Sequence, residues 1–430
     1  MLRRRRSCDQ CDPITPRTLP RDSFEGSRPD LTPVYDPGMT RRRLFLILVV
    51  LVVGSTVAAW GYAKSRGVGV STVIEEVIRG GPGYEVLAGA PLKISIVRRY
   101  ADSLLADPVD VAELPDSSLL LALKAGALIH LDPQTGVARE ILDIRDRVRT
   151  STEEGMLAVA LHPQFGAGKE TRVYITYIDG NDGSTRLDVF NLDPTGLTLV
   201  EPLTNLFSFE HFNKNHMAAD MEFSPNGLLL LATGDSGGSG DPERSAQDPD
   251  SSLGKILEID VDVMPIAPVN RAIGLRNPWK VAIGSKSGAL WIADVGQDGV
   301  EEVSVLNDTR ADPPVNFGWP IVEGESCYAA LSCTKPTDYV APRTSYAHNA
   351  GRCSIIGAAF AEEHFLFADY CSGEFFAIPL DAAAATEPTA VKLTGKWPRL
   401  MPVALFSDSL GRVWIIDQLK SKIFQVSVSR

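Results

Sequence analysis

The sequence predicts an all-β protein, a six-bladed β-propeller preceded by a single N-terminal transmembrane helix. Three observations carry this prediction. A hairpin-like pattern recurs six times, helical periodicity is nearly absent after residue 80, and one uncharged apolar run stands close to the N-terminus. The first two features are typical of a domain built from β-repeats. The third is long enough to cross a bilayer.

Each repeat consists of an alternating apolar strand, a polar turn and a dense apolar strand, as in a β-hairpin. The copies begin 46 to 77 residues apart, which suits blades with loops of unequal length. They start at Val111, Val159, Met221, Val281, Ala358 and Ala404. A six-bladed propeller over residues 95–430 would close such repeats into a ring with few exposed edges. An array of β-sandwiches is the alternative.

The N-terminal segment and the rest of the chain carry net charges of opposite sign. Residues 1–66 hold 12 Lys and Arg against 6 Asp and Glu, so residues 67–430 carry a net charge of −18 within the total of −12. Such an acidic body argues against nucleic-acid binding, because phosphates are met by Lys and Arg. Residues 1–40, rich in Arg, Pro, Asp and Ser, are predicted to be a disordered cytoplasmic tail.

Residues 41–64 are predicted to be a membrane anchor. Three arginines are followed by a run without charge from Leu44 to about Ala63, which at about 1.5 Å per residue spans roughly 30 Å of hydrocarbon. The ten arginines on its N-terminal side predict a cytoplasmic N-terminus and a periplasmic or extracellular propeller, joined by a tether over residues 65–94. A cleaved signal peptide and a buried core helix are the alternatives.

Four of the six cysteines lie in the predicted exported part, where disulfides persist. Three pairings are possible, and we predict the local one, Cys327 with Cys333 and Cys353 with Cys371. The other two, Cys8 and Cys11, form a single C-x-x-C, which is a weak zinc or redox signal.

Four polar segments stand between the repeats, where the loops of a propeller line its axis. They are EEGMLAVALHPQF from Glu153, NHMAADMEFSPNG from Asn215, GLRNPWKVAI from Gly274, and DVGQDGVEEVSVLNDTRADPPVNFGWPIVEG from Asp294. In this order they resemble motifs of the glucose/sorbosone dehydrogenase family, six-bladed propellers that use pyrroloquinoline quinone (PQQ). The resemblance covers roughly residues 100–425. CSIIGAAF and FLFADYCSGEFFAI extend it to the cysteine-bearing branch of that family, which also contains animal ectodomain propellers that bind partners.

The resemblance implies an aldose-type dehydrogenase that depends on PQQ and Ca²⁺. His216 would take the proton of a sugar or alcohol hydroxyl while hydride passes to the quinone, a task that suits an imidazole with an unperturbed pKa of about 6.5. Arg276 and Asn277 match the pair that contacts the quinone oxygens and the substrate, where an arginine stabilises the reduced quinone. Electrons would leave through a membrane quinone or another carrier.

The remaining implied site residues bind the cofactor or the metal. Cofactor contacts are implied for Glu153, for Asn215, for Trp319 with its flat face, and for Arg399 as a partner of PQQ carboxylates. The carbonyls of Gly296 and Gln297 would hold Ca²⁺, with Asp298 and Glu302 as nearby oxygen ligands.

Two segments depart from the family pattern: residues 216–219, and KWPRLMPVALF before the last repeat, where Met401 and Pro402 stand at positions for which the resemblance implies a second arginine and an acid. Where the family has HNGG, this chain has His216 followed by Met217, Ala218 and Ala219. Glycine allows close backbone approach, so the replacements threaten the room for a tricyclic cofactor. The alternative function is therefore a non-catalytic exported propeller that acts as a binding or scaffold module. A metal-dependent lactonase would need an axial Glu/Asn/Asp cluster that these motifs do not supply.

Overall fold

The computed structural model describes residues 85–86, 90–168, 170–193, 197–380, 392–397, 400–418 and 421–430. The predicted tail and anchor, residues 1–64, lie outside these ranges. Within them, no helix is long and apolar enough to cross a membrane, and the helical structure consists of one 3₁₀ turn, Ser245–Gln247.

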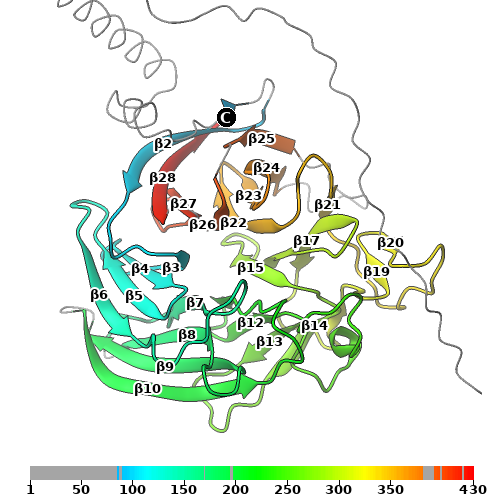
Figure 1. Ribbon diagram of the computed structural model, residues 1–430, viewed down its shortest axis with the longest axis horizontal. Helices are drawn as coiled ribbons and strands as arrows, with labels where there is room; N and C mark the ends of the chain where they lie inside the picture. Colours follow the sequence, from blue (N-terminus) through cyan, green and yellow to red (C-terminus); the bar gives the residue numbers. More distant parts are fainter. Residues whose placement is uncertain are drawn as a thin grey trace, which may run out of the picture. The chain divides into compact units, whose positions relative to one another are not determined.

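The described residues form the predicted six-bladed propeller (Figure 1). The first blade is β3 (Pro108–Glu113), β4 (Leu119–Leu123), β5 (Ala127–Leu131) and β6 (Ala138–Asp143). The second is β7 (Met156–Leu161), β8 (Arg172–Ile178), β9 (Thr185–Asp193) and β10 (Thr198–Phe209). The third is β11 (Met221–Phe223), β12 (Leu229–Thr233), β13 (Lys255–Ile259) and β14 (Val269–Ile273), with β18 (Val315–Asn316) added in parallel.

The fourth blade is β15 (Pro278–Ile283), β16 (Leu290–Asp294), β17 (Val300–Leu306) and β21 (Thr344–Ala347). The fifth is β22 (Ile355–Ala361), β23 (His364–Asp369), β24 (Glu374–Pro379) and β25 (Lys392–Lys396), with β1 (Glu85–Val86) at its edge. The sixth is β26 (Pro402–Ser407), β27 (Val413–Asp417), β28 (Lys422–Ser429) and β2 (Lys93–Tyr100). A separate hairpin joins β19 (Val322–Glu323) and β20 (Ser326–Cys327). Each predicted repeat is the innermost hairpin of one blade.

The sixth blade closes the ring. Its outermost strand, β2, precedes the first blade in sequence and pairs antiparallel with β28, from Lys93 opposite Ser429 to Tyr100 opposite Ile423. Pairing the two ends of the propeller removes the free edge that an open array of repeats would expose.

The apolar core fills the six interfaces between neighbouring blades. Val109 and Leu120 of the first blade pack with Val159 of the second, for example, and five further clusters fill the other interfaces. Because neighbours cover both faces of a blade, a strand in its middle is mainly apolar. This explains the dense runs of β4, β12, β16 and β27, in which every residue is buried.

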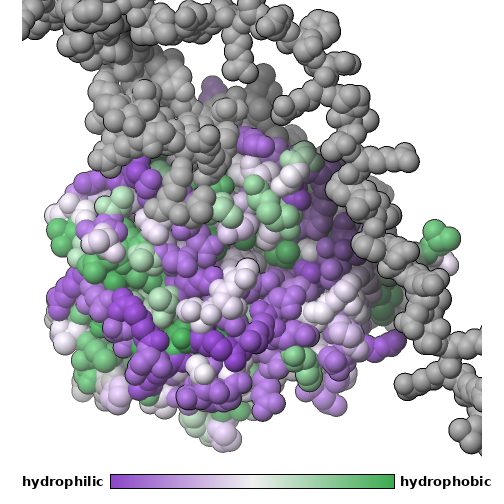
Figure 2. Space-filling model, in the orientation of Figure 1, coloured by the Kyte–Doolittle hydropathy of each residue, from purple (hydrophilic) through white to green (hydrophobic). Residues whose placement is uncertain are grey.

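Charges are buried along the axis. The Nζ atom of Lys280 lies 2.6 Å from Oδ1 of Asp110 and 2.9 Å from Oδ1 of Asp220, so it links the fourth blade to the first and third. Burial raises the pKa of Asp220 to about 6 and that of nearby Glu222 to about 8. All four residues line a cavity of about 300 Å³ formed by the innermost strands. The face seen in Figure 2, which looks onto the ring of blades, is mainly hydrophilic where it is coloured, with hydrophobic residues scattered among the polar ones.

Candidate active site

A second axial cavity, of about 340 Å³, lies where the innermost strands begin. Val109 and Val403, near the starts of β3 and β26, line it, whereas Val111 and Leu405 further along the same strands line the cavity around Lys280. Six predicted site residues share its wall: Glu153, His216, Arg276, Asn277, Gly296 and Gln297. They come from the loops before β7, β11 and β15 and the loop after β16, which the ring brings together. Trp279 also lines this cavity, and its indole N–H donates to the Val403 carbonyl at 3.3 Å.

His216 is held by a carboxylate that the sequence analysis did not single out. His216 is 5% exposed, and its Nδ1 lies 2.6 Å from Oδ1 of Asp235. Because a carboxylate accepts hydrogen bonds, it places the ring proton on Nδ1 and leaves the Nε2 lone pair for a ligand. The residue has a φ of +57°, a region in which histidine is enriched among non-glycine residues. The geometry therefore suits a general base.

Asp235 is itself fixed. Its Oδ2 accepts a 2.7 Å hydrogen bond from Nε1 of Trp319, and its Oδ1 accepts one from the amide of Gly237 at 2.7 Å. Just before it, a Cβ at position 234 would lie 1.9 Å from the His216 carbonyl, so only glycine lets the two segments meet.

Glu153 joins three segments of the wall. Its Oε2 accepts hydrogen bonds from the amides of His216 at 2.6 Å and Met217 at 3.2 Å, and from Nδ2 of Asn277 at 3.4 Å. Oδ1 of Asn277 in turn accepts from the amide of Ala218 at 3.1 Å. The glutamate thus positions the base and the amide relative to each other.

Arg276 is preorganised on the wall. Nη1 donates to the Val295 carbonyl at 2.7 Å, Nη2 donates to Oε1 of Gln297 at 3.2 Å, and the guanidinium lies 5.6 Å from the Trp319 ring centroid. The backbone amides of Arg276 and Asn277 donate to Asp294 at 3.0 and 2.7 Å. Burial raises the pKa of Asp294 to about 7. This arrangement supplies a fixed positive charge beside an amide.

The loop after β16 wraps around a carboxylate. Oε1 of Glu323 accepts hydrogen bonds from the amides of Gln297, Asp298 and Gly299 at 2.8 to 2.9 Å. In a trans peptide the carbonyl points opposite to the following amide, so the carbonyls of Gly296 and Gln297 point away from Glu323. These two residues line the cavity and Glu323 does not, so their carbonyl oxygens suit a hard cation.

Other predicted site residues lie off the cavity wall. Asn215 and Asp298 are exposed, and Glu302 accepts a hydrogen bond from the amide of Gly324. Trp319 is buried behind Asp235 and Arg276 rather than offering its face to a ligand. Arg399 lies outside the described residues. Across the described ranges, no group of three or more His, Cys, Asp or Glu is placed to hold a metal ion, so the side-chain ligands expected of Asp298 and Glu302 gain no support.

The departure at residues 217–219 does not fill the cavity. Met217, Ala218 and Ala219 are at most 1% exposed and none lines the wall. None of them has a positive φ, so no glycine is required at these positions. The expected loss of room is therefore not found in this segment.

A family model described as glucose/sorbosone dehydrogenase matches residues 105–351, more than half of the chain. The chain belongs to this family. The matched range holds every predicted site residue except Arg399. The glucose/sorbosone dehydrogenase assignment makes the protein a member of an oxidoreductase family.

Two curated relatives match this chain at similar sequence identity. HIPL1 protein of Arabidopsis thaliana is 27% identical over 315 residues, covering 56% of this chain and 43% of the relative. Aldose sugar dehydrogenase YliI of Escherichia coli strain K12 is 26% identical over 252 residues, covering 55% of this chain and 64% of the relative. The chain therefore spans less than two thirds of the length of either relative.

Two solved structures share the propeller fold. The PQQ-bound form of aldose sugar dehydrogenase from Streptomyces coelicolor superposes with a TM-score of 0.64 at 22% identity, covering 80% of this chain and all of that one. The holo form of the pyranose dehydrogenase PQQ domain from Coprinopsis cinerea gives a TM-score of 0.58 at 15% identity, covering 81% and 97%. At these identities the likeness shows the fold alone.

Three functional candidates escaped the sequence analysis. Asp235 lies in GDSGG, just after the apolar strand that follows His216 in the sequence. An acidic residue at that position is the sequence signal that could have identified it. Lys124 lines the cavity just after the end of β4. A lysine at the end of a strand does not by itself indicate a functional site. Glu323 became a candidate only through the loop folded around it.

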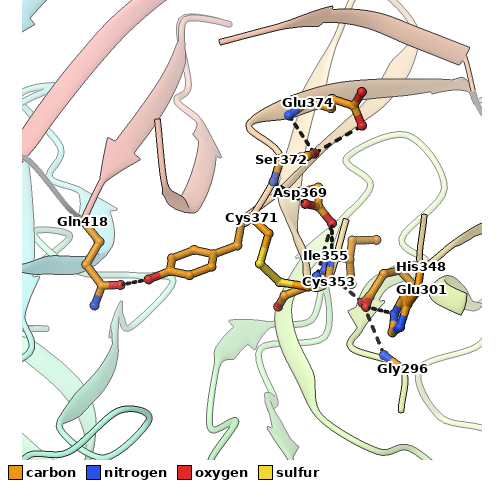
Figure 3. Close-up of a disulfide and its surroundings, with 12 residues drawn as sticks. Gly296, Glu301, His348, Cys353, Ile355, Asp369, Cys371, Ser372, Glu374 and Gln418 are labelled. Atoms are coloured by element: carbon orange, nitrogen blue, oxygen red, sulfur yellow. Dashed lines mark hydrogen bonds and ion pairs between the residues drawn. A yellow bond between two sulfur atoms is a disulfide. The ribbon is translucent and has the colours of Figure 1, made fainter. Parts of the chain in front are cut away.

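Both predicted disulfides are confirmed. Cys327 pairs with Cys333, and Cys353 pairs with Cys371. Figure 3 shows the second bridge with two nearby carboxylates, Asp369 and Glu301, that hydrogen-bond the backbone around it. Asp369 accepts from the amides of Cys353 at 3.0 Å and Ser354 at 3.2 Å, and Glu301 accepts from the amide of Ile355 at 2.9 Å. Because Cys353 and Ser354 line the cavity, this bridge supports the fifth-blade wall of the site.

Replacing both Cys353 and Cys371 with serine should lower the free energy of unfolding by about 3 kcal/mol, the chain-entropy value for a loop of this size, since the bridge spans 18 residues. The matched control is Cys327→Ser with Cys333→Ser, which opens a loop of 6 residues and should cost about 2 kcal/mol. Urea unfolding measures both. A larger loss in the control would contradict this ranking.

Proposed function

We propose that the protein is a PQQ- and Ca²⁺-dependent dehydrogenase of aldose sugars. The supporting observation is the His216–Asp235 pair, which leaves Nε2 for a cavity shared with Arg276 and Asn277. Family membership supports the redox chemistry, and the names of the E. coli and S. coelicolor relatives suggest the substrate class.

The cavity residues fit the cofactor in most respects. The volume of about 340 Å³ lies in the usual range of small-molecule sites. Arg276 would meet the quinone oxygens, and the carbonyls of Gly296 and Gln297 would meet Ca²⁺. Lys124 adds a second cation to the wall.

The chain's own residues divide the chemistry. When bound, PQQ supplies the carbon that accepts hydride. His216 accepts the hydroxyl proton at Nε2, and Asp235 stabilises the imidazolium that results. Arg276 places positive charge where negative charge develops, and its bonds to Val295 and Gln297 avoid reorganisation during the reaction. The apolar side chains of Met156, Trp279 and Ile356 on the same wall help to exclude water.

Residues 41–64 would hold this dehydrogenase at the outer side of a membrane, within reach of a membrane electron acceptor. Carbonate extraction of cells that express the full chain tests the anchor. Release of the intact chain into the soluble fraction would contradict it.

A cofactor titration tests the activity. Purified full-length protein in detergent, with its disulfides intact, is titrated with PQQ and Ca²⁺, and the visible spectrum is recorded before and after aldoses are added. We expect saturable binding followed by sugar-dependent reduction. Absence of binding at micromolar PQQ, in a protein that melts cooperatively, would overturn the proposal.

That outcome would favour the second candidate, a propeller that binds a partner without cofactor. One observation speaks for it. PQQ carries three carboxylates, whereas Lys124 and Arg276 are the cations on the described wall, and a carboxylate buried without a partner is costly.

A further inference from the structure

The two cations of the cavity enter it from opposite sides of the ring. Arg276 stands just before β15 of the fourth blade, and Lys124 directly follows β4 of the first blade. In a ring of six blades the first and fourth face each other across the axis (Figure 1). Lys124 belongs to none of the motifs that carry the family resemblance.

The placement of Lys124 is fixed by its neighbours. Its Nζ donates to the Thr152 carbonyl at 2.7 Å, and its own carbonyl accepts from the amide of Met156 at 2.8 Å. A Cβ at position 155 would lie 2.5 Å from Cγ of Lys124 and 2.7 Å from its carbonyl. Only glycine at this position lets the lysine stem pass along the wall.

The ammonium retains donors for a ligand. It has three N–H groups, of which Thr152 takes one, and no carboxylate among the described residues forms an ion pair with it. Glu153 lies on the same wall, but its Oε2 accepts from the amides of His216 and Met217. A cation held by its stem and lacking an anionic partner suits a carboxylate brought by a ligand.

We infer that Lys124 is a carboxylate-binding residue of this site, which pairs with a PQQ carboxylate on the first-blade side of the cavity. The inference rests on the proposed function. It follows from the positive charge of Lys124 and from its position on the first-blade side of the cavity. Arg276 and a Ca²⁺ at Gly296 and Gln297 lie on the fourth-blade side, so neither serves a carboxylate that extends toward the first blade.

The dissociation constant of PQQ tests this in full-length protein at saturating Ca²⁺, followed by the visible spectrum without substrate. Lys124→Met should weaken binding by about 10- to 100-fold, the usual value of a hydrogen bond to a charged group, and Lys124→Arg should restore most of it. Lys286→Met is the matched control, because this lysine has a side chain that is 74% exposed and lies away from the site. It should leave the constant unchanged.

Varying the ionic strength distinguishes a loss of charge from a loss of packing as the cause of weaker PQQ binding. The dissociation constant should rise less steeply with salt in Lys124→Met than in the wild type, because one screened pair is gone. Weaker binding with an unaltered salt dependence, or unaltered binding in Lys124→Met, would overturn the role of Lys124 alone. Failure of the wild type to bind PQQ would overturn the proposed function and this inference with it.

Discussion

Asparagine in place of His216 should lower kcat by about 10² to 10⁴-fold without releasing PQQ. The change removes the only ring nitrogen that the Asp235 contact leaves for the substrate. Asparagine tolerates the positive φ of this position, and its amide can still donate to Asp235, so the fold is preserved. Steady-state kinetics with an aldose and PQQ titration of the same preparation measure the two effects.

His364→Asn is the matched control, because this histidine lies at the start of β23, off the cavity wall, and bonds the Glu362 carbonyl. It should keep the wild-type kcat. Asp235→Asn should lower kcat and alter its pH profile, because an amide can donate to Nδ1 and move the ring proton to Nε2. A His216→Asn variant with PQQ bound and near-normal kcat would show that the base lies elsewhere.

The repeats predicted the propeller because each one is a hairpin that can bury its apolar faces only against neighbouring copies of the same pattern. The innermost hairpin of every blade carries its own turn, and its second strand is mainly apolar because neighbouring blades cover both of its faces. The convergence of Glu153, His216 and Asn277 could be expected from the motifs, since loops that precede innermost strands meet at one mouth of the axis. The partner of β28 could not, because β2 lacks a repeat pattern.

The directions in which individual side chains point could not be predicted from the sequence. Successive residues of a strand face opposite ways, so on β17 it is Glu301 that accepts from the amide of Gly296, while Glu302 turns to Gly324. Trp319 is predicted to offer its flat face to a ligand, but in the structure its N–H donates a hydrogen bond to Asp235. Which of two adjacent acids enters a site depends on strand register, and no motif encodes that here.

Methionine in place of Lys280 should cost about 3–5 kcal/mol of unfolding free energy at neutral pH, the usual loss when one partner of a buried ion pair is removed. Asp110 and Asp220 would then keep the hydrogen bonds from the backbone amides of Val159 and Val281 but would share a buried site without a cation. Urea unfolding measures the loss. Lys286→Met removes an exposed pair with Glu363 and should change stability by less than about 0.5 kcal/mol.

The deficit of Lys280→Met should shrink as the pH falls. Burial raises the pKa of Asp220 to about 6 even beside the lysine, above the ordinary value of about 3.9, and removal of the lysine raises it further. The folded variant then binds more protons than its unfolded chain, so its stability rises as pH decreases from about 7 toward about 4. Equal losses at about pH 7.5 and about pH 5 would mean that the lost stability reflects packing of the lysine stem, because a charge-based loss must follow protonation of Asp220.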